Sequence, residues 1–416
     1  MVRSLYKYIN LHLNTSSNSG QRLFDIVLYA CNNLAAPVFN IVLSFILIKR
    51  VSLTLWGEYV SALLVINVCI MIAGWGHKEF LLRAFSKHPA QIKLNWQNNL
   101  VSRSILCCII VAALSVYFDH SFVRLLSILA FIIFSFVYKS MDVLILYKKL
   151  FSFSAILELI GYALLTSVLL IYPAAQLTLD VVLLWSAAII FMKCIISIWY
   201  LRNDIFPLQR VYSFFSLQNT LLLSLPFFLP SLAGLFQMKA DLYAVAWFLT
   251  EENVGEYQIF TSLLNVPHLL AGFAVMPFLK NIYRLQTNSI DKIIRLMTLA
   301  GVLLSIPVIG VSYIMIEYYY GFSFSVWMYA FGYLQIIPFF IYLINIHMLF
   351  RSDRQYAVLG VLLIAAIFSF ISSLLFIPYW GLEGAILVNA LTQWLTLGLF
   401  RSYNFFSLNR SDAVTF

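Results

Sequence analysis

Charged residues are scarce in this 416-residue sequence: Asp, Glu, Lys and Arg make up only 10%, whereas 62% of the residues are hydrophobic. Soluble domains carry about 25% charged and about 45–50% apolar residues, so the composition excludes a chain built of soluble globular domains. It also excludes a disordered chain, which would be polar and charge-rich. The apolar runs are continuous, as in the run from Ser104, and do not alternate with polar residues. This pattern predicts membrane-spanning helices and not a barrel.

Short catalytic and cofactor motifs are also missing. The sequence has no Gly-rich phosphate loop ending in Lys, no His-Glu-x-x-His, no Cys-x-x-Cys and no nucleophile elbow. We therefore expect neither an enzyme nor a cofactor or metal site. The five cysteines have neither metal-ligand spacing nor loop positions suited to disulfides, and we interpret them as packing residues.

Hydropathy predicts an all-α polytopic membrane protein with about twelve transmembrane helices, because one span needs about 20 mostly apolar residues. The first apolar run is too long for the hydrophobic part of a cleaved signal peptide, so we expect it to be the first span. The expected spans are 24–48, 57–76, 104–118, 124–138, 154–172, 179–200, 217–240, 255–279, 296–317, 325–349, 357–377 and 382–400.

The positions of Lys and Arg agree with this count. With twelve spans, 21 of the 26 basic residues fall on one side of the membrane, in the terminal segments and alternate loops. Three lie on the other side (Lys49, Arg50 and Arg124), and Lys193 and Lys239 lie inside spans. By the positive-inside rule, both termini are then cytoplasmic. The formal charge of +9 therefore reflects topology, and we expect no nucleic-acid partner.

A short motif occurs twice. Gly57-Glu58-Tyr59 opens the second span and Gly255-Glu256-Tyr257 opens the eighth, each followed after seven residues by Asn-Val. These spans occupy equivalent positions if the chain consists of two six-helix halves, 1–210 and 211–416. Both copies enter the membrane from the same side, so the repeat would be parallel, which is a plan found in transporters.

Charged side chains inside spans are candidate site residues. A charge at the centre of a span costs about 2.5–3.5 kcal/mol, so it usually faces a bundle interior or a water-filled cavity. Lys239 and Asp241 are two residues apart and do not face each other on a regular helix. Two prolines and a glycine in the same span suggest a kinked helix. The alternative is that this span ends near Gln237 and both charges meet water.

Other candidates allow two interpretations each. Glu158 and Lys193 either line a cavity or lie near the cytoplasmic interface. Asp25 is either an intramembrane charge or a charge at a helix start. Arg83 either holds an anionic headgroup or is an ordinary cytoplasmic basic residue. Asn265 adds an amide to the eighth span.

Three segments carry a family resemblance: Trp56-Gly57-Glu58-Tyr59 with Gly74 and Gly76, the stretch 248–284, and Gly381-Leu382-Glu383-Gly384-Ala385. In these segments the chain resembles the Wzx-like O-antigen flippases, a polysaccharide-export branch of the multidrug/oligosaccharidyl-lipid/polysaccharide exporter (MOP) superfamily. It departs from the family pattern in two places. Thr54-Leu55 stands where a Leu-Gly step is common, and Gln258-Ile259-Phe260 stands where small residues are common.

The resemblance implies that the chain turns an undecaprenyl-diphosphate-linked oligosaccharide, such as an O-antigen repeat unit for lipopolysaccharide, across the bacterial inner membrane. Membrane lipid and other polysaccharide assembly proteins would be its partners. The residues expected to bind substrate are Lys239, Lys193, Arg83 and Asn265. The residues expected to couple an ion are Asp241, Glu158 and Asp25.

Three alternatives remain at this stage. A drug/cation antiporter of the same superfamily would have the same helix count. A polytopic O-antigen polymerase would usually carry a large outer loop, and the outer loops expected here are short. A structural or assembly subunit would not need the repeat or the intramembrane charges.

The predicted topology can be tested by tagging the loops. We expect phosphatase fusions after residues 50 and 120 to be active outside the cell, because these loops carry few basic residues. Fusions at both ends and near residue 90 should be inactive. Termini on opposite faces would contradict the twelve-span arrangement.

Overall fold

The computed structural model describes residues 35–117, 121–207, 214–275, 287–351 and 354–412. Within these ranges the chain contains helices and no strand, which confirms the all-α prediction. One predicted site residue, Asp25, lies outside the described residues.

In the described part of the chain, nine helical segments are long and apolar enough to cross a membrane. They contain α3 (Leu53–Gly74) with α4 (His77–Lys87), α5 (Ile92–Tyr117), α6 (Phe122–Tyr147), α7 (Phe151–Ile171), α8 (Leu179–Tyr200), α10 (Phe214–Phe248), α13 (Thr287–Ile314), α14 (Val326–Arg351) and α15 (Gln355–Asp412). The helix α11 (Glu251–Val275) and the helical residues 35–50 add two further segments.

These segments account for the twelve expected spans. The last two expected spans lie within α15, whose backbone departs from helical geometry at Gly381 (φ 57°, ψ −135°). Glycine adopts a positive φ at little cost, so the chain breaks the helix there. The eighth expected span corresponds to α11, which begins with Glu251 and Glu252. The first expected span overlaps residues 35–50.

Several helices extend further than hydropathy suggested. α5 begins at Ile92 and α6 ends at Tyr147. Arg103 and Lys139 therefore lie in helices, whereas hydropathy predicts loops at both positions. α10 continues to Phe248, so the helix does not end near Gln237, and Lys239 and Asp241 both lie within it. Hydropathy misplaces such ends because a helix keeps its hydrogen-bond pattern through polar residues.

The contacts within the chain define two compact units. The first unit takes in Met1–Ile46 and Ala62–Phe228, and the second takes in Leu47–Ser61 and Leu229–Phe416. The expected division into 1–210 and 211–416 stays a prediction. The observed boundary lies inside α10, and the first turns of α3 belong to the second unit.

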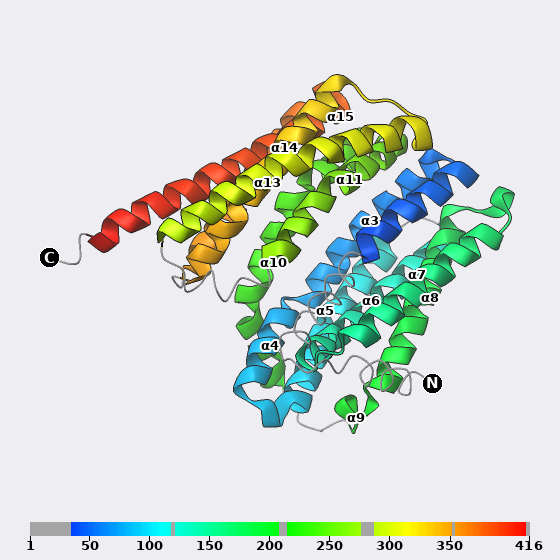
Figure 1. Cartoon of the computed structure of the whole chain (residues 1–416). Coiled ribbons are helices and arrows are strands. Elements are labelled where there is room, and N and C mark those ends of the chain that lie inside the picture. The colour runs from blue at the N-terminus through cyan, green and yellow to red at the C-terminus, as the bar shows by residue number, and fades with distance from the viewer. Residues whose placement is uncertain (1–34, 118–120, 208–213, 276–286, 352–353, 413–416) are drawn as a thin grey trace, which may run out of the picture. The chain divides into compact units, whose positions relative to one another are not determined.

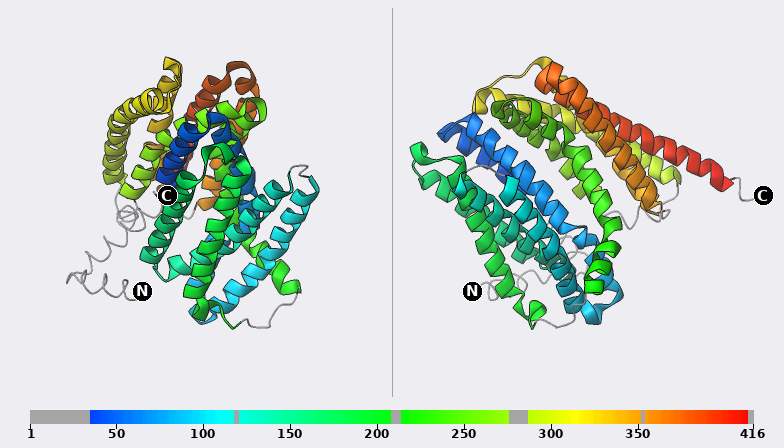
Figure 2. Two further views of the ribbon diagram at one scale, coloured as in Figure 1. Left: turned by 90° about the vertical axis from the view of Figure 1, so that its right-hand side faces the viewer. Right: turned by 180° about the vertical axis from the view of Figure 1, so that it is seen from behind.

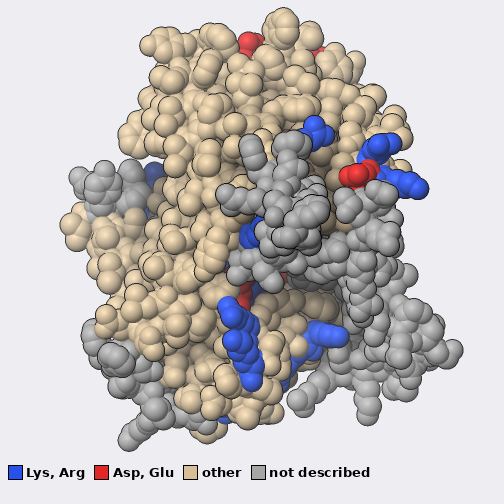
Figure 3. All heavy atoms as spheres, turned by 90° about the vertical axis from the view of Figure 1, so that its left-hand side faces the viewer, with Lys and Arg blue, Asp and Glu red and all other residues tan. Residues whose placement is uncertain are grey.

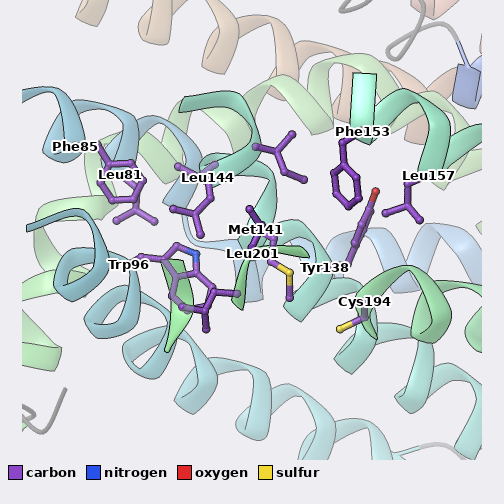
Figure 4. Close-up of a cluster of buried hydrophobic side chains, with 13 residues drawn as sticks. Leu81, Phe85, Trp96, Tyr138, Met141, Leu144, Phe153, Leu157, Cys194 and Leu201 are labelled. Atoms are coloured by element: carbon purple, nitrogen blue, oxygen red, sulfur yellow. The ribbon is translucent and has the colours of Figure 1, made fainter. Parts of the chain in front are cut away.

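The core of the first unit lies between α4, α5, α6, α7 and α8, and α6 packs most extensively on α8 (Figure 1). Figure 4 shows Trp96 beside Leu201, and Tyr138 between Phe153 and Leu157. The indole of Trp96 donates a 2.7 Å hydrogen bond to the carbonyl oxygen of Ser140, so this large side chain is buried without losing its polar partner. This packing fixes the positions of α6, α7 and α8.

The second unit is built around the packing of α14 on α13 and α15 (Figures 1 and 2). Its core includes Ile341, Tyr342, Val361 and Phe400. The Tyr342 hydroxyl donates a 2.7 Å hydrogen bond to the side-chain oxygen of Gln393, which satisfies both buried polar groups.

Large apolar side chains are exposed along the outer faces of the helices. Examples are Ile109 (60% exposed) and Ile171 (83%). Most of the described surface visible in Figure 3 carries neither acidic nor basic side chains. Such surfaces would be costly in water but suit contact with lipid. The chain is therefore a multi-pass membrane protein.

The two copies of the repeated motif lie close together within the second unit. A Cβ atom on Gly57 of α3 would overlap the backbone oxygen of Glu251, and one on Gly255 of α11 would approach Leu53 and Trp56. The Ser61 hydroxyl donates to the Glu251 carboxylate at 2.6 Å, and the Thr54 hydroxyl donates to Glu252 at 3.0 Å. The glycines therefore permit a close helix crossing that these hydrogen bonds complete.

We expect Gly57→Ala to destabilise the protein, because the added methyl group overlaps backbone that cannot rotate away. Overpacking of this kind typically costs about 1–3 kcal/mol. The measurement is the thermal unfolding midpoint of the purified protein in detergent, which should fall by several degrees. Gly234→Ala is the matched control, because a Cβ there meets no atom within 4 Å. Equal midpoints for the two variants would contradict the close crossing.

Candidate functional site

In the first unit, the structure brings together two residues that the sequence analysis named for different roles. Lys193 of α8 lies with its Nζ atom 2.6 Å from Oε2 of Glu158 on α7, and the two side chains are 7% and 17% exposed. The hydroxyl of Tyr138 on α6 donates a 2.7 Å hydrogen bond to the other carboxylate oxygen of Glu158. Both oxygens therefore have donors, as a buried carboxylate requires.

Aromatic rings and a glycine enclose the Lys193 ammonium. Nζ lies 4.6 Å from the ring centroid of Tyr162 and 5.9 Å from that of Tyr138, within the range of cation–π attraction. The Tyr162 ring stacks on Phe39 at 4.1 Å. A Cβ atom on Gly161 would overlap Cε of Lys193, so the side chain occupies space that only glycine leaves open.

Further charged groups interact electrostatically with this pair. The Asp142 carboxylate on α6 interacts electrostatically with Lys139, Lys78, Glu158 and Lys193. The sequence analysis missed Lys139 and Asp142 because it placed them in a cytoplasmic loop. Lys139 and Asp142 are three residues apart, so a helix that continued past residue 138 would place both on one face. The cluster thus contains three lysines and two carboxylates.

Arg103 lies elsewhere in the first unit and was also missed. Its side chain is 1% exposed, donates to Oδ1 of Asn99 at 2.7 Å and to the Ser140 hydroxyl at 3.0 Å, and lies 5.1 Å from the Phe136 ring centroid. No ion pair of Arg103 is seen among the described residues, and its Nη1 has no hydrogen-bond partner there. Burying a guanidinium this way is costly.

The predicted lipid-headgroup residue Arg83 is exposed on α4. The opposite face of that helix buries Leu81 and Phe85 in the core of the first unit. The structure therefore places Arg83 on the surface and not with the Glu158–Lys193 pair. Its role in headgroup binding stays a prediction.

In the second unit, Asp241 is the centre of a buried polar cluster. Its side chain is 3% exposed and accepts hydrogen bonds from the Tyr257 hydroxyl, from Nδ2 of Asn389 at 2.5 Å and from its own helix at Leu242 N, at 2.9 Å. The two side-chain donors come from α11 and α15, while Asp241 and Leu242 belong to α10. Three helices thus meet at one carboxylate, and the third residue of the second motif copy, Tyr257, contributes to it.

Lys239 lies two residues before Asp241 on α10, and Asn265 lies on α11. Both side chains are half-buried, and neither donates a hydrogen bond to Asp241. The charges of Lys239 and Asp241 interact electrostatically without forming an ion pair. This agrees with the expectation that residues two apart on a helix do not face each other. In the described chain, no group of three metal-binding side chains is present.

Comparison with known proteins identifies the fold. The chain is similar to the lipid II flippase MurJ in its inward closed conformation, with a TM-score of 0.70 and 11% identity over 92% of this chain and 87% of MurJ. It is also similar to the eukaryotic MATE transporter AtDTX14, with a TM-score of 0.60 and 15% identity over 90% and 92% of the two chains. A MOP superfamily transporter from Pyrococcus furiosus aligns with a TM-score of 0.56 and 12% identity over 92% and 94%.

No family model matches the sequence, and no curated protein matches it. The structural neighbours are a flippase and transporters, not enzymes, and they share the fold of the MOP superfamily with this chain. The Wzx-like branch suggested by the sequence is not distinguished from other branches by this likeness.

The Glu158–Lys193 pair should behave as a coupled unit in stability measurements. Lys193→Met leaves the Glu158 carboxylate buried without its cation, which typically costs about 3–5 kcal/mol. The unfolding midpoint in detergent should fall, whereas the double variant Glu158→Leu with Lys193→Met should recover most of the loss. If the loss in the double variant equalled the sum of the losses in Lys193→Met and Glu158→Leu alone, the two residues would not be energetically coupled.

Proposed function

We propose that the chain is a flippase that moves an undecaprenyl-diphosphate-linked oligosaccharide, an O-antigen or similar polysaccharide repeat unit, from the cytoplasmic to the outer face of a bacterial inner membrane. The observation that carries this proposal is the presence of buried charged clusters in helices of a MOP-type transporter fold. Such charges are costly in a membrane, and where they occur they usually mark substrate or ion pathways.

The chemistry of the substrate fits these clusters. A diphosphate and a sugar chain cannot cross hydrocarbon unaided, whereas the polyprenyl tail can stay in the bilayer. Cationic side chains such as Lys193 and Lys239 suit phosphate oxygens. The Arg83 guanidinium would meet headgroups at the surface, and the Asn265 amide suits sugar hydroxyls.

The energy source in this proposal is an ion gradient. Asp241, with three donors from three helices, is the main candidate for coupling, together with Glu158 and Asp25. A cation that bound Asp241 would alter the hydrogen bonds that join α10, α11 and α15 and thereby favour one arrangement of these helices. In this scheme both termini are cytoplasmic.

The second candidate function is drug or cation antiport. The similarity to the MATE transporter AtDTX14 favours it, because a buried carboxylate such as Asp241 can also hold an organic cation. Export of ethidium from cells that lack other pumps distinguishes this function. If the protein exports ethidium and deletion of its gene leaves surface polysaccharide unchanged, antiport replaces the flippase proposal.

The flippase proposal is tested by deleting the gene in its own host. Lipid-linked repeat units should accumulate on the inner leaflet, and surface polysaccharide should disappear. The double variant Lys193→Ala with Lys239→Ala should restore less than a tenth of the surface polysaccharide at normal expression. Lys87→Ala, an exposed lysine at the end of α4, is the control and should restore it fully. Full restoration by the double variant would contradict the role of these cations.

A further inference from the structure

Lys193 is not a free cation in this structure. Its ammonium lies 2.6 Å from Oε2 of Glu158, with both side chains largely buried, so the charges of the pair cancel. A phosphate group that approached Lys193 would therefore meet a carboxylate beside it. Since like charges repel strongly in a medium of low dielectric constant, phosphate and ionised Glu158 would compete for the same ammonium.

The contacts of Glu158 make the carboxylate depend on Lys193. Oε1 accepts from Tyr138, and Oε2 accepts from Lys193. While the ammonium stays at Oε2, its positive charge favours the ionised form of Glu158. When the ammonium moves to another anion, the carboxylate loses its counter-charge, and protonation becomes more favourable.

The surroundings favour movement of the lysine and not of the carboxylate. Lys193 has a flexible four-carbon stem with several rotatable bonds, and this stem packs directly against Gly161. Glu158 is held by Tyr138, whose ring is buried between Phe153 and Leu157 (Figure 4). The ammonium can thus change partners while the carboxylate stays in place.

The other charged groups near the pair set the charge balance. They are Asp142 and Lys139 on α6 and Lys78 on α4, and two tyrosines, Tyr138 and Tyr162, also face the pair. Protonation of Glu158 removes one negative charge from this neighbourhood, which favours an anionic ligand over a neutral one.

We propose that anion binding at Lys193 is linked to protonation of Glu158. An organic diphosphate accepts the hydrogen bonds of the Lys193 ammonium. The Glu158 carboxylate then takes one proton at Oε2 from a buffer acid in the solvent. An O–H bond forms at Glu158, the acid's bond to that hydrogen breaks, its conjugate base is released, and no electrons are transferred. The identity of the anion as a polyprenyl diphosphate rests on the proposed function; the exchange itself follows from the geometry of the pair.

Linkage fixes the sign of the pH effect. If binding takes up one proton, the affinity for the diphosphate increases as the pH falls, by up to tenfold per pH unit. Replacing Glu158 by Gln removes both the competing charge and the proton site. The variant should bind more tightly at high pH and lose the part of the pH dependence that Glu158 supplies.

The test uses the full-length protein in nanodiscs, with undecaprenyl diphosphate as the probe. Calorimetric titration in buffers of different ionisation enthalpy gives the number of protons taken up on binding. We expect the wild-type protein to take up about one proton more than Glu158→Gln. Glu79→Gln, an exposed glutamate of α4, is the matched control and should behave as wild type.

Each outcome bears on a different claim. Equal proton uptake by wild type and Glu158→Gln, with binding intact, overturns the exchange but leaves the flippase proposal standing. No binding of undecaprenyl diphosphate by wild type overturns both.

If Glu158→Gln fails to fold, infrared spectroscopy of the wild-type protein tests the exchange instead. Adding undecaprenyl diphosphate to the wild-type protein should produce a carboxylic-acid C=O band. Tyr138→Phe should shift this band, because Tyr138 donates to Oε1 of Glu158. Binding without such a band overturns the exchange.

Discussion

The cost of removing an ionised side chain from water governs the structure. In helices that cross hydrocarbon, every buried charge needs hydrogen-bond partners or counter-charges. The Glu158–Lys193 pair, the Asp241 cluster and the contacts of Arg103 are three solutions to this requirement. Each is assembled from residues on different helices or successive turns, so the polar clusters and the helix packing depend on one another.

The two compact units meet this requirement differently. The first unit places lysines and carboxylates together, so its cluster has opposite charges that can exchange partners. The second unit surrounds one carboxylate with a phenol, an amide and a backbone N–H, so its charge is held by neutral donors. A charged cluster suits an anionic headgroup, whereas a lone carboxylate suits a cation. In the proposed function, the cluster of the first unit would bind the anionic headgroup and Asp241 would bind the coupling cation.

Much of the fold could be predicted from the sequence, and the site only in part. Continuous apolar runs determine where helices cross the membrane, so the all-α class and most spans follow from hydropathy alone. Glu158, Lys193 and Asp241 also stand out as polar residues in apolar segments. Which residues partner them does not follow from the sequence, because Tyr138 and Asn389 lie on other helices and reach the site only through helix packing. Arg103 and Lys139 were misplaced because polar helix ends resemble loops in composition.

The space beside Gly161 has a consequence for how this protein can diverge. Any larger residue at that position would collide with the lysine stem, so position 161 should stay glycine for as long as position 193 is lysine. Homologues that lose the lysine are released from this restriction and can accept alanine or serine there. If positions 158, 161 and 193 change together among homologues, the pair has been conserved as a unit during evolution.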